Sequence, residues 1–121
     1  KGPDMNSKNS VDYKLKYAVF LIGDSKYELA LSILLDALES NPMAKELYLN
    51  VGYILILKKE YIVAETYLKK ALSLDPDYVL AYENLILLSR LQNKELDLTS
   101  YLNNILEIAP EHNLKYHIVN E

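Results

Sequence analysis

The stretch Lys70–Tyr78 reads KALSLDPDY, and in it an apolar run ends abruptly in an Asp-Pro pair. Proline has no backbone N–H and disfavours the helical conformation in the residue before it, so a helix through Leu72 has to stop here. The fixed φ of Pro76 suits the first turn of a following helix, and we expect the Asp75 carboxylate to cap the N–H groups of that turn. The stretch therefore predicts a boundary between two helices.

The same boundary occurs three times in the chain. Pro42, Pro76 and Pro110 are spaced by 34 residues, and each follows a similar run: LLDALESNP, LKKALSLDP and LNNILEIAP. Alignment on these prolines gives three units without insertion or deletion, 11–44, 45–78 and 79–112. A fixed period of this length is the sequence signature of a repeat architecture.

Each unit carries two helical patterns with a polar break between them. In the second unit, Tyr48, Val51, Gly52 and Leu55 follow the i, i+3, i+4, i+7 spacing of one helix face. Ala64, Leu68 and Ala71 form a similar stripe after the break. The small residues let two helix backbones approach closely, so each unit is predicted to be a helical hairpin that stacks on its neighbour. The predicted structural positions are Tyr48, Gly52, Ala64, Ala71, Pro42, Pro76 and Pro110.

The composition narrows the class of protein. Of the 121 residues half are hydrophobic, none is cysteine, and the net charge is −4, which disfavours a surface for the phosphates of nucleic acid. No uncharged apolar run of about 18 residues is present, so we expect no membrane insertion by this segment. We interpret residues 1–10 as a tag remnant or disordered linker, and residues 113–121 as a capping helix or the start of a further repeat. Compartment is not fixed by these features; cytoplasmic is the default, with a periplasmic or envelope location if a parent chain carries a signal or anchor.

The residue types of catalytic and metal sites do not form a convincing group. His112 and His117 are five residues apart rather than at the i, i+4 spacing of a helical metal site. Asp75 and Asp77 flank a proline without the further oxygen ligands of a calcium loop. A glycine-rich phosphate loop and a nucleophile elbow are also missing from the sequence. We therefore expect no enzyme activity, no cofactor and no metal.

The repeated pattern resembles the tetratricopeptide repeat family. Unit 45–78 matches the family pattern best, with Tyr48, Gly52, Ala64, Ala71 and Pro76 in its key positions, and the resemblance spans residues 11–112. It implies an all-α fold: a right-handed α-solenoid of three helix-turn-helix hairpins plus a C-terminal capping or partial helix.

The resemblance also implies a concave groove, lined by the first helix of each hairpin, that binds a segment of a partner protein. The residues it places there are Leu15, Val19, Ile22, Leu49, Asn50, Tyr53, Ile56, Leu57, Leu87 and Arg90. One family subset holds a chaperone's C-terminal carboxylate with a clamp of Lys, Asn and Arg side chains. Only Asn50 matches that clamp, and Leu15, Val19 and Leu80 occupy positions where it needs polar or basic groups, so we do not expect a chaperone tail as ligand.

The predicted groove is apolar, centred on Leu49, Tyr53 and Ile56, and three explanations stay open at this point. A partner's apolar helix or extended segment covers it, the protein covers it by self-association or intramolecular packing, or these residues pack more tightly between the helices than the family pattern implies. The favoured hypothesis is a non-catalytic protein-protein interaction module, a scaffold or assembly part of a larger protein. RNA binding by a helical repeat is a remote alternative, because base-reading polar side chains and a basic surface are lacking.

Overall fold

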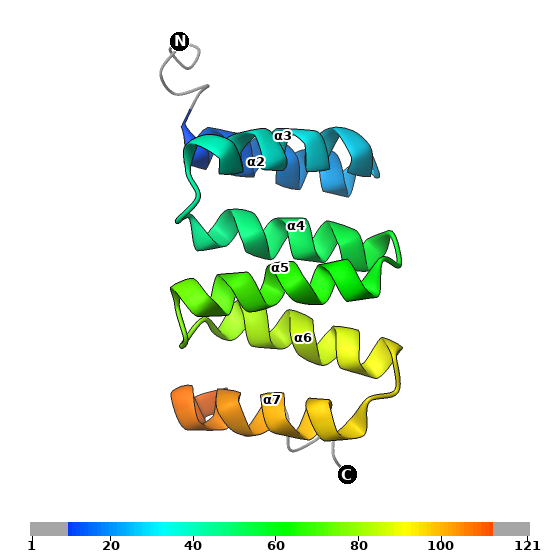
Figure 1. Cartoon of the computed structure of the whole chain (residues 1–121), viewed down its shortest axis with the longest axis vertical. Coiled ribbons are helices and arrows are strands. Elements are labelled where there is room, and N and C mark those ends of the chain that lie inside the picture. The colour runs from blue at the N-terminus through cyan, green and yellow to red at the C-terminus, as the bar shows by residue number, and fades with distance from the viewer. Residues whose placement is uncertain (1–9, 113–121) are drawn as a thin grey trace.

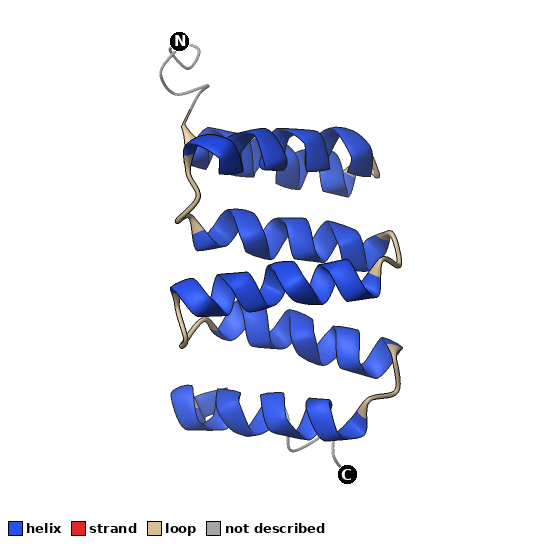
Figure 2. Ribbon diagram, in the orientation of Figure 1, coloured by secondary structure: helices blue, strands red, loops and turns tan. Residues whose placement is uncertain are grey.

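The computed structural model describes residues 10–112, and within them every regular element is helical. The elements are α2 (Val11–Gly23), α3 (Tyr27–Ser40), α4 (Lys45–Leu57), α5 (Tyr61–Leu74), α6 (Val79–Leu91), α7 (Glu95–Ile108) and the short 3-10 helix η1 (Pro110–His112) (Figure 2). The prediction of an all-α helical repeat is confirmed. The predicted N-terminal linker up to residue 9 and the C-terminal helix at 113–121 lie outside the described residues.

The helices pair into three hairpins that stack along the long axis of the molecule (Figure 1). Within the stack, α3 packs on α4 and α5 packs on α6, so the second helix of each hairpin contacts the first helix of the next. The first helices are also neighbours, because α4 contacts both α2 and α6. One large apolar core runs from α2 to α6, and a smaller cluster of Ile86, Leu102 and Ile105 lies between α6 and α7.

The turn inside each hairpin has the same backbone conformation in all three units. Ser25, Lys59 and Asn93 occupy equivalent positions and have φ values of 59°, 64° and 57°, in the left-handed region that non-glycine residues rarely adopt. The N–H of the next residue then bonds back to a carbonyl in the preceding helix, as Glu60 does to Leu55 at 2.8 Å. Each turn thereby satisfies a carbonyl at the end of the first helix.

The prolines end the second helices as predicted. Helices α3, α5 and α7 stop two residues before Pro42, Pro76 and Pro110. The residue directly before each proline has left the helical region, with φ between −138° and −146°. This is the conformation that the proline ring imposes on its predecessor.

The expected role of Asp75 as a cap for the following helix is wrong. Pro76 lies in a turn closed by a 3.1 Å bond from the N–H of Tyr78 to the carbonyl of Asp75, and α6 begins only at Val79. The Asp75 carboxylate accepts the N–H of Asp77 at 3.1 Å, which stabilises this turn. Tyr78 is the N-cap residue of α6, and it makes no side-chain capping bond. Proline thus sits at the second position of a turn, where its φ fits equally well.

Candidate functional site

The central helix α4 shows which side of the first helices is open to solvent. Seven of its thirteen residues are buried, because α4 has neighbours in its own hairpin and in both adjacent ones. Glu46, Asn50, Tyr53 and Leu57 stay accessible and follow the i, i+4, i+7, i+11 spacing of one narrow stripe. The open side of α4 is therefore a single line of side chains.

The 34-residue register extends this line to the neighbouring helices. None of the equivalent residues on α2 and α6 is buried either. Since α4 contacts both helices, the three lines form one continuous surface. We call this surface the A-face: Asp12, Lys16, Val19 and Gly23 of α2; Glu46, Asn50, Tyr53 and Leu57 of α4; Leu80, Asn84, Leu87 and Leu91 of α6.

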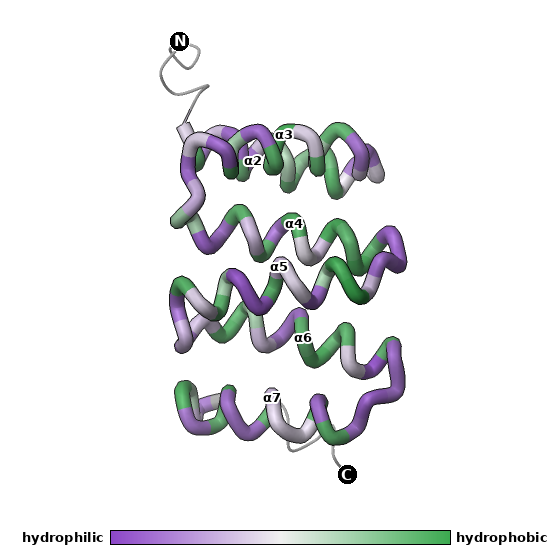
Figure 3. The backbone as a smooth tube through the Cα atoms, viewed as in Figure 1, coloured by the Kyte–Doolittle hydropathy of each residue, from purple (hydrophilic) through white to green (hydrophobic). Residues whose placement is uncertain are grey.

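The A-face is divided into a polar half and an apolar half. The half toward the N-terminal ends of the helices is polar, with Leu80 as its one apolar side chain. It includes an ion pair of Lys16 with Asp12 at 3.1 Å. The apolar half lies toward the C-terminal ends, where the hydropathy of α4 also rises (Figure 3). We call this half the apolar band: Val19, Tyr53, Leu57, Leu87 and Leu91.

Two asparagines line the border between the two halves. The amide of Asn50 donates to the carbonyl of Glu46 at 2.8 Å, and the amide of Asn84 donates to the carbonyl of Leu80 at 2.9 Å. The equivalent bonds hold both side chains in the same orientation on neighbouring helices. An asparagine side chain has two donor hydrogens and an acceptor oxygen, so each one retains capacity for the main chain of a ligand.

The structure places the ten predicted groove residues in four different environments. Leu49 and Ile56 are buried, with 9% and 4% of their surface exposed, so the prediction that they form the centre of an open apolar patch is wrong. They lie beside the A-face stripe, about 80° from it around the axis of α4, and both belong to the main apolar core. Leu15 and Ile22 are half-buried against the core, and Arg90 is exposed outside the stripe.

Five of those residues lie together on the A-face: Val19, Asn50, Tyr53, Leu57 and Leu87. The predicted site did not include Leu91 of the apolar band, which is exposed. The sequence repeat could have identified Leu91 as a site residue, because Leu91 lies one 34-residue period after Leu57.

The tyrosines of the repeat positions hold the hairpins together. The hydroxyls of Tyr48 and Tyr82 donate to the carbonyls of Pro42 and Pro76 at 2.8 and 3.2 Å, each fixing the turn before its helix. Their rings also pack against tyrosines of α5 and α7, with centroid separations of 6.3 and 6.2 Å. Both tyrosines therefore have a structural role.

A cluster of charge and aromatic groups fastens the turn after α5 to the start of α4. Lys45 forms an ion pair with Asp75, and its Nζ lies 4.5 Å from the centre of the Tyr78 ring. The hydrogen bond from Lys45 holds the pKa of Asp75 below its ordinary value. Burial raises the pKa of Tyr78 to about 12, and the negative charges of Glu46 and Asp75 act in the same direction.

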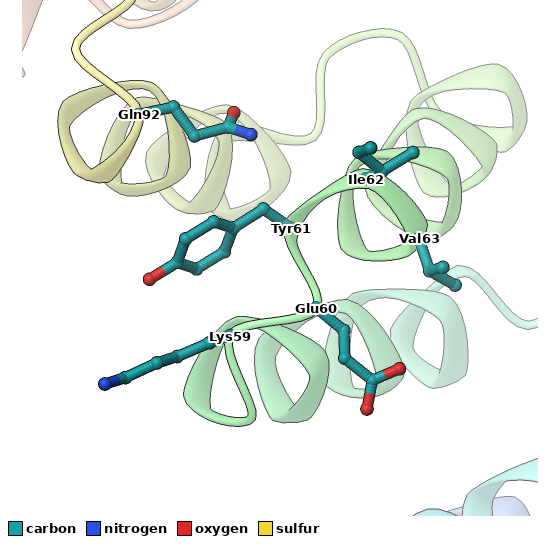
Figure 4. A pocket seen from close by; sticks show the side chains of 6 residues that line it. All are labelled: Lys59, Glu60, Tyr61, Ile62, Val63 and Gln92. Carbon is teal, nitrogen blue, oxygen red and sulfur yellow. The ribbon is translucent and has the colours of Figure 1, made fainter.

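A separate depression of about 410 Å³ lies where the α4–α5 turn faces the end of α6. Its lining side chains diverge, with Lys59 and Tyr61 on one side and Ile62 and Val63 on the other (Figure 4). Residues 10–112 contain no cluster of His, Cys, Asp or Glu that could hold a metal ion. In that same range, none of the helices is long and apolar enough to cross a membrane. The A-face is the stronger candidate site, because its polar and apolar groups share one surface.

Comparison with known proteins agrees with this geometry. Residues 45–78, the complete second unit, match the tetratricopeptide repeat family model. The structure of YrrB, described as a tetratricopeptide repeat protein with an unusual peptide-binding site, superposes with a TM-score of 0.79 at 21% identity, over 91% of this chain and 57% of that one. This chain contains a tetratricopeptide repeat and has the fold of that family.

Two further solved tetratricopeptide structures are similar. The first tetratricopeptide domain of Spaghetti (RPAP3), bound to the HSP90 peptide SRMEEVD, has a TM-score of 0.75 at 20% identity, with 80% of this chain and 77% of that one covered. MamA from Desulfovibrio magneticus RS-1 has a TM-score of 0.77 at 16% identity, with coverage of 87% and 59%. The chain thus spans under two thirds of the length of YrrB and of MamA. The search of curated proteins gave no match.

Proposed function

We propose that this protein is a non-catalytic interaction module whose A-face binds an apolar segment of a partner protein. The observation that carries the proposal is the apolar band of Val19, Tyr53, Leu57, Leu87 and Leu91, which three neighbouring helices leave uncovered. Contiguous exposed apolar surface on a helical scaffold marks an interaction site more often than it marks bare surface. Peptide binding is also named for two proteins of the same fold, YrrB and RPAP3.

The border asparagines favour an extended peptide as the ligand. Asn50 and Asn84 are held in matching orientations on adjacent helices, next to the band. A peptide crossing the helices would place apolar side chains on the band while its main chain meets these amides. In this arrangement the apolar band supplies most of the affinity, and the two amides fix the orientation of the peptide. Binding sites commonly combine a mostly apolar surface with a few polar groups in this way.

An acidic C-terminal tail is a poor fit to the same surface. Lys16, the A-face cation, already pairs with Asp12, and Leu80 occupies a position where a carboxylate clamp needs a base. A carboxylate would gain few charge-assisted hydrogen bonds here. The proposed ligand is therefore apolar rather than anionic.

Selection from a phage-displayed library of random 12-residue peptides tests this proposal. We expect peptides rich in aliphatic and aromatic residues to be enriched by the unmodified protein. The double variant Tyr53→Glu with Leu57→Glu should bind those peptides at least about tenfold more weakly, since two charges enter the apolar band. The matched control is Ile62→Glu with Val63→Glu, which adds the same charges to exposed apolar positions on α5 and should keep full affinity.

Circular dichroism should give the same helix content for all three proteins. Equal loss of affinity in both double variants, or in neither, would place the peptide site away from the A-face. Enrichment of acidic peptides without apolar residues would contradict the proposed ligand chemistry.

A further inference from the structure

A second apolar surface lies on a different side of α2. Tyr13, Tyr17 and Phe20 follow the i, i+4, i+7 spacing of one helix face, and we call them the α2 stripe. Tyr13 is half-buried, whereas Tyr17 and Phe20 are 44% and 68% exposed. The rings of Tyr13 and Tyr17 lie 6.5 Å apart. The stripe shares no residue with the A-face, whose apolar band includes Val19 of this helix.

The repeat register shows what normally covers this side of a first helix. The residues equivalent to the α2 stripe are at most 2% exposed in both later units: Leu47, Val51 and Ile54 of α4, and Ala81, Leu85 and Leu88 of α6. Among the described residues, a hairpin precedes α4 and another precedes α6, and in each case its second helix packs on the helix that follows, as α3 on α4 and α5 on α6. Residues 10–112 contain no hairpin before α2. The α2 stripe is the same surface without that helix.

The side of α6 opposite to Ala81, Leu85 and Leu88 provides a useful contrast. Leu49 and Ile56 are buried on α4, but their counterparts on α6 are Glu83 and Arg90. This side of α6 thus carries charged residues, which are soluble when exposed to water. The α2 stripe instead carries three aromatic rings in a chain with no other phenylalanine and no tryptophan.

We propose that the α2 stripe is a docking surface for the second helix of a further tetratricopeptide-type hairpin. The occupant is an amphipathic helix of the kind seen in α3 and α5, which are each 14 residues long and carry an Ala-Leu-Ala stripe. It sits on α2 as α3 sits on α4, which continues an interface that the fold already uses twice. Residues 1–9 do not have this chemistry, because KGPDMNSKN contains Met5 as its one large apolar side chain.

An extended chain tests the proposal directly. Residues 45–78 are placed immediately before Val11, so that Tyr78 precedes Val11 as it precedes Val79 in the natural order. Phe20, the sole phenylalanine, is replaced by 4-fluorophenylalanine, which gives one fluorine signal from the stripe. We expect the signal to lose most of its H₂O/D₂O isotope shift in the extended chain. The melting temperature should rise by at least about 5 °C.

Matched variants isolate the stripe from the general effect of a longer chain. Tyr17→Glu with Phe20→Glu should remove most of the rise in melting temperature on extension. Leu29→Glu with Leu35→Glu adds the same charge at exposed apolar positions of α3 and should leave the rise intact. If the stripe variant loses helix content before extension, Phe20→Gln alone takes its place.

Three results would overturn the proposal. A fluorine signal that stays fully exposed in the extended chain, or a rise in melting temperature that survives in the stripe variant, would show that α2 does not accept the hairpin. Third, if the 121-residue chain without extension sediments as a dimer and becomes monomeric in the stripe variant, a second copy is the occupant. None of these results depends on whether the A-face binds peptides, so the two proposals fail separately.

Discussion

At the scale of single residues, Gly52 decides how closely α4 and α5 approach. A Cβ atom built on Gly52 would lie 2.8 Å from Cγ and Cδ2 of Leu68 and 3.4 Å from the carbonyl oxygen of Ala64. Leu68 and Ala64 are fully buried, so neither has free space into which it can move. The absence of a side chain at Gly52 is therefore a packing requirement rather than a need for backbone freedom.

We expect Gly52→Ala to destabilise the protein. The clash in a filled core costs about 1–3 kcal/mol, whereas the better helix propensity of alanine returns about 1 kcal/mol. The free energy of unfolding in urea should therefore fall by about 1 kcal/mol in the balance of these terms. Gly23→Ala is the matched control, because nothing lies within 4 Å of its Cβ position. Equal stability of the two variants would contradict the close-packing argument.

At the scale of elements, the turns and helix ends follow local rules that repeat from unit to unit. The left-handed residues Ser25, Lys59 and Asn93 show how different side chains are forced into one backbone shape by the hairpin. Asparagine tolerates this conformation better than lysine or serine, and glycine adopts it without steric cost. The three turns are therefore equal in geometry but unequal in strain.

Replacing Lys59 by glycine should stabilise the second hairpin. Relief of the left-handed strain is worth about 1–2 kcal/mol, and the extra freedom of glycine in the unfolded chain takes back about 0.5–1 kcal/mol. We expect a net gain of about 0.5–1 kcal/mol in the free energy of unfolding. Lys94→Gly removes the same charge at a residue with φ of −101° and should lose stability instead. A loss of stability in both variants would show that Lys59 is not strained.

Sequence alone predicts these elements well but predicts the open surface only in part. Pro76 and the spacing from Tyr48 to Leu55 act through local sterics and helix periodicity, which a single chain segment expresses by itself. Burial of Leu49 and Ile56 arises differently, since it depends on the adjacent hairpins that flank α4. Tyr53 and Leu57 differ from them only by rotation about the helix axis. Helix periodicity alone does not determine which side of a helix the neighbouring helices cover.

At the scale of the whole molecule, the hairpins are joined by short turns and fixed by contacts that cross those turns. Lys45, Asp75 and Tyr78 form such a joint between the start of α4, the end of α5 and the start of α6. Because the pKa of the Tyr78 phenol is raised to about 12 by burial and by negative neighbours, ionisation of this group is coupled to the stability of the stack.

Tyr78→Phe should make the protein less sensitive to alkali. A raised pKa means that the neutral phenol contributes stability that is fully present below about pH 10 and is lost as the pH rises toward 12. Urea unfolding at pH 8 should give similar midpoints for both proteins, because the ring that Lys45 contacts is kept. Between pH 10 and 12 the midpoint of the natural protein should fall further than that of the variant. Parallel curves over that range would contradict the assignment.

The small separate cluster of Ile86, Leu102 and Ile105 has a mechanical consequence. Tension applied at the two ends of the stack acts on the hairpins in series, so the one with the least shared core yields first. That is the third hairpin, because the buried residues of its second helix α7 belong to the small cluster and none of them to the large core that joins α2 to α6. Its 34 residues would release about 110 Å of contour length in one step, at up to about 3.3 Å per residue. The molecule would lengthen by whole hairpins under load rather than stretch evenly.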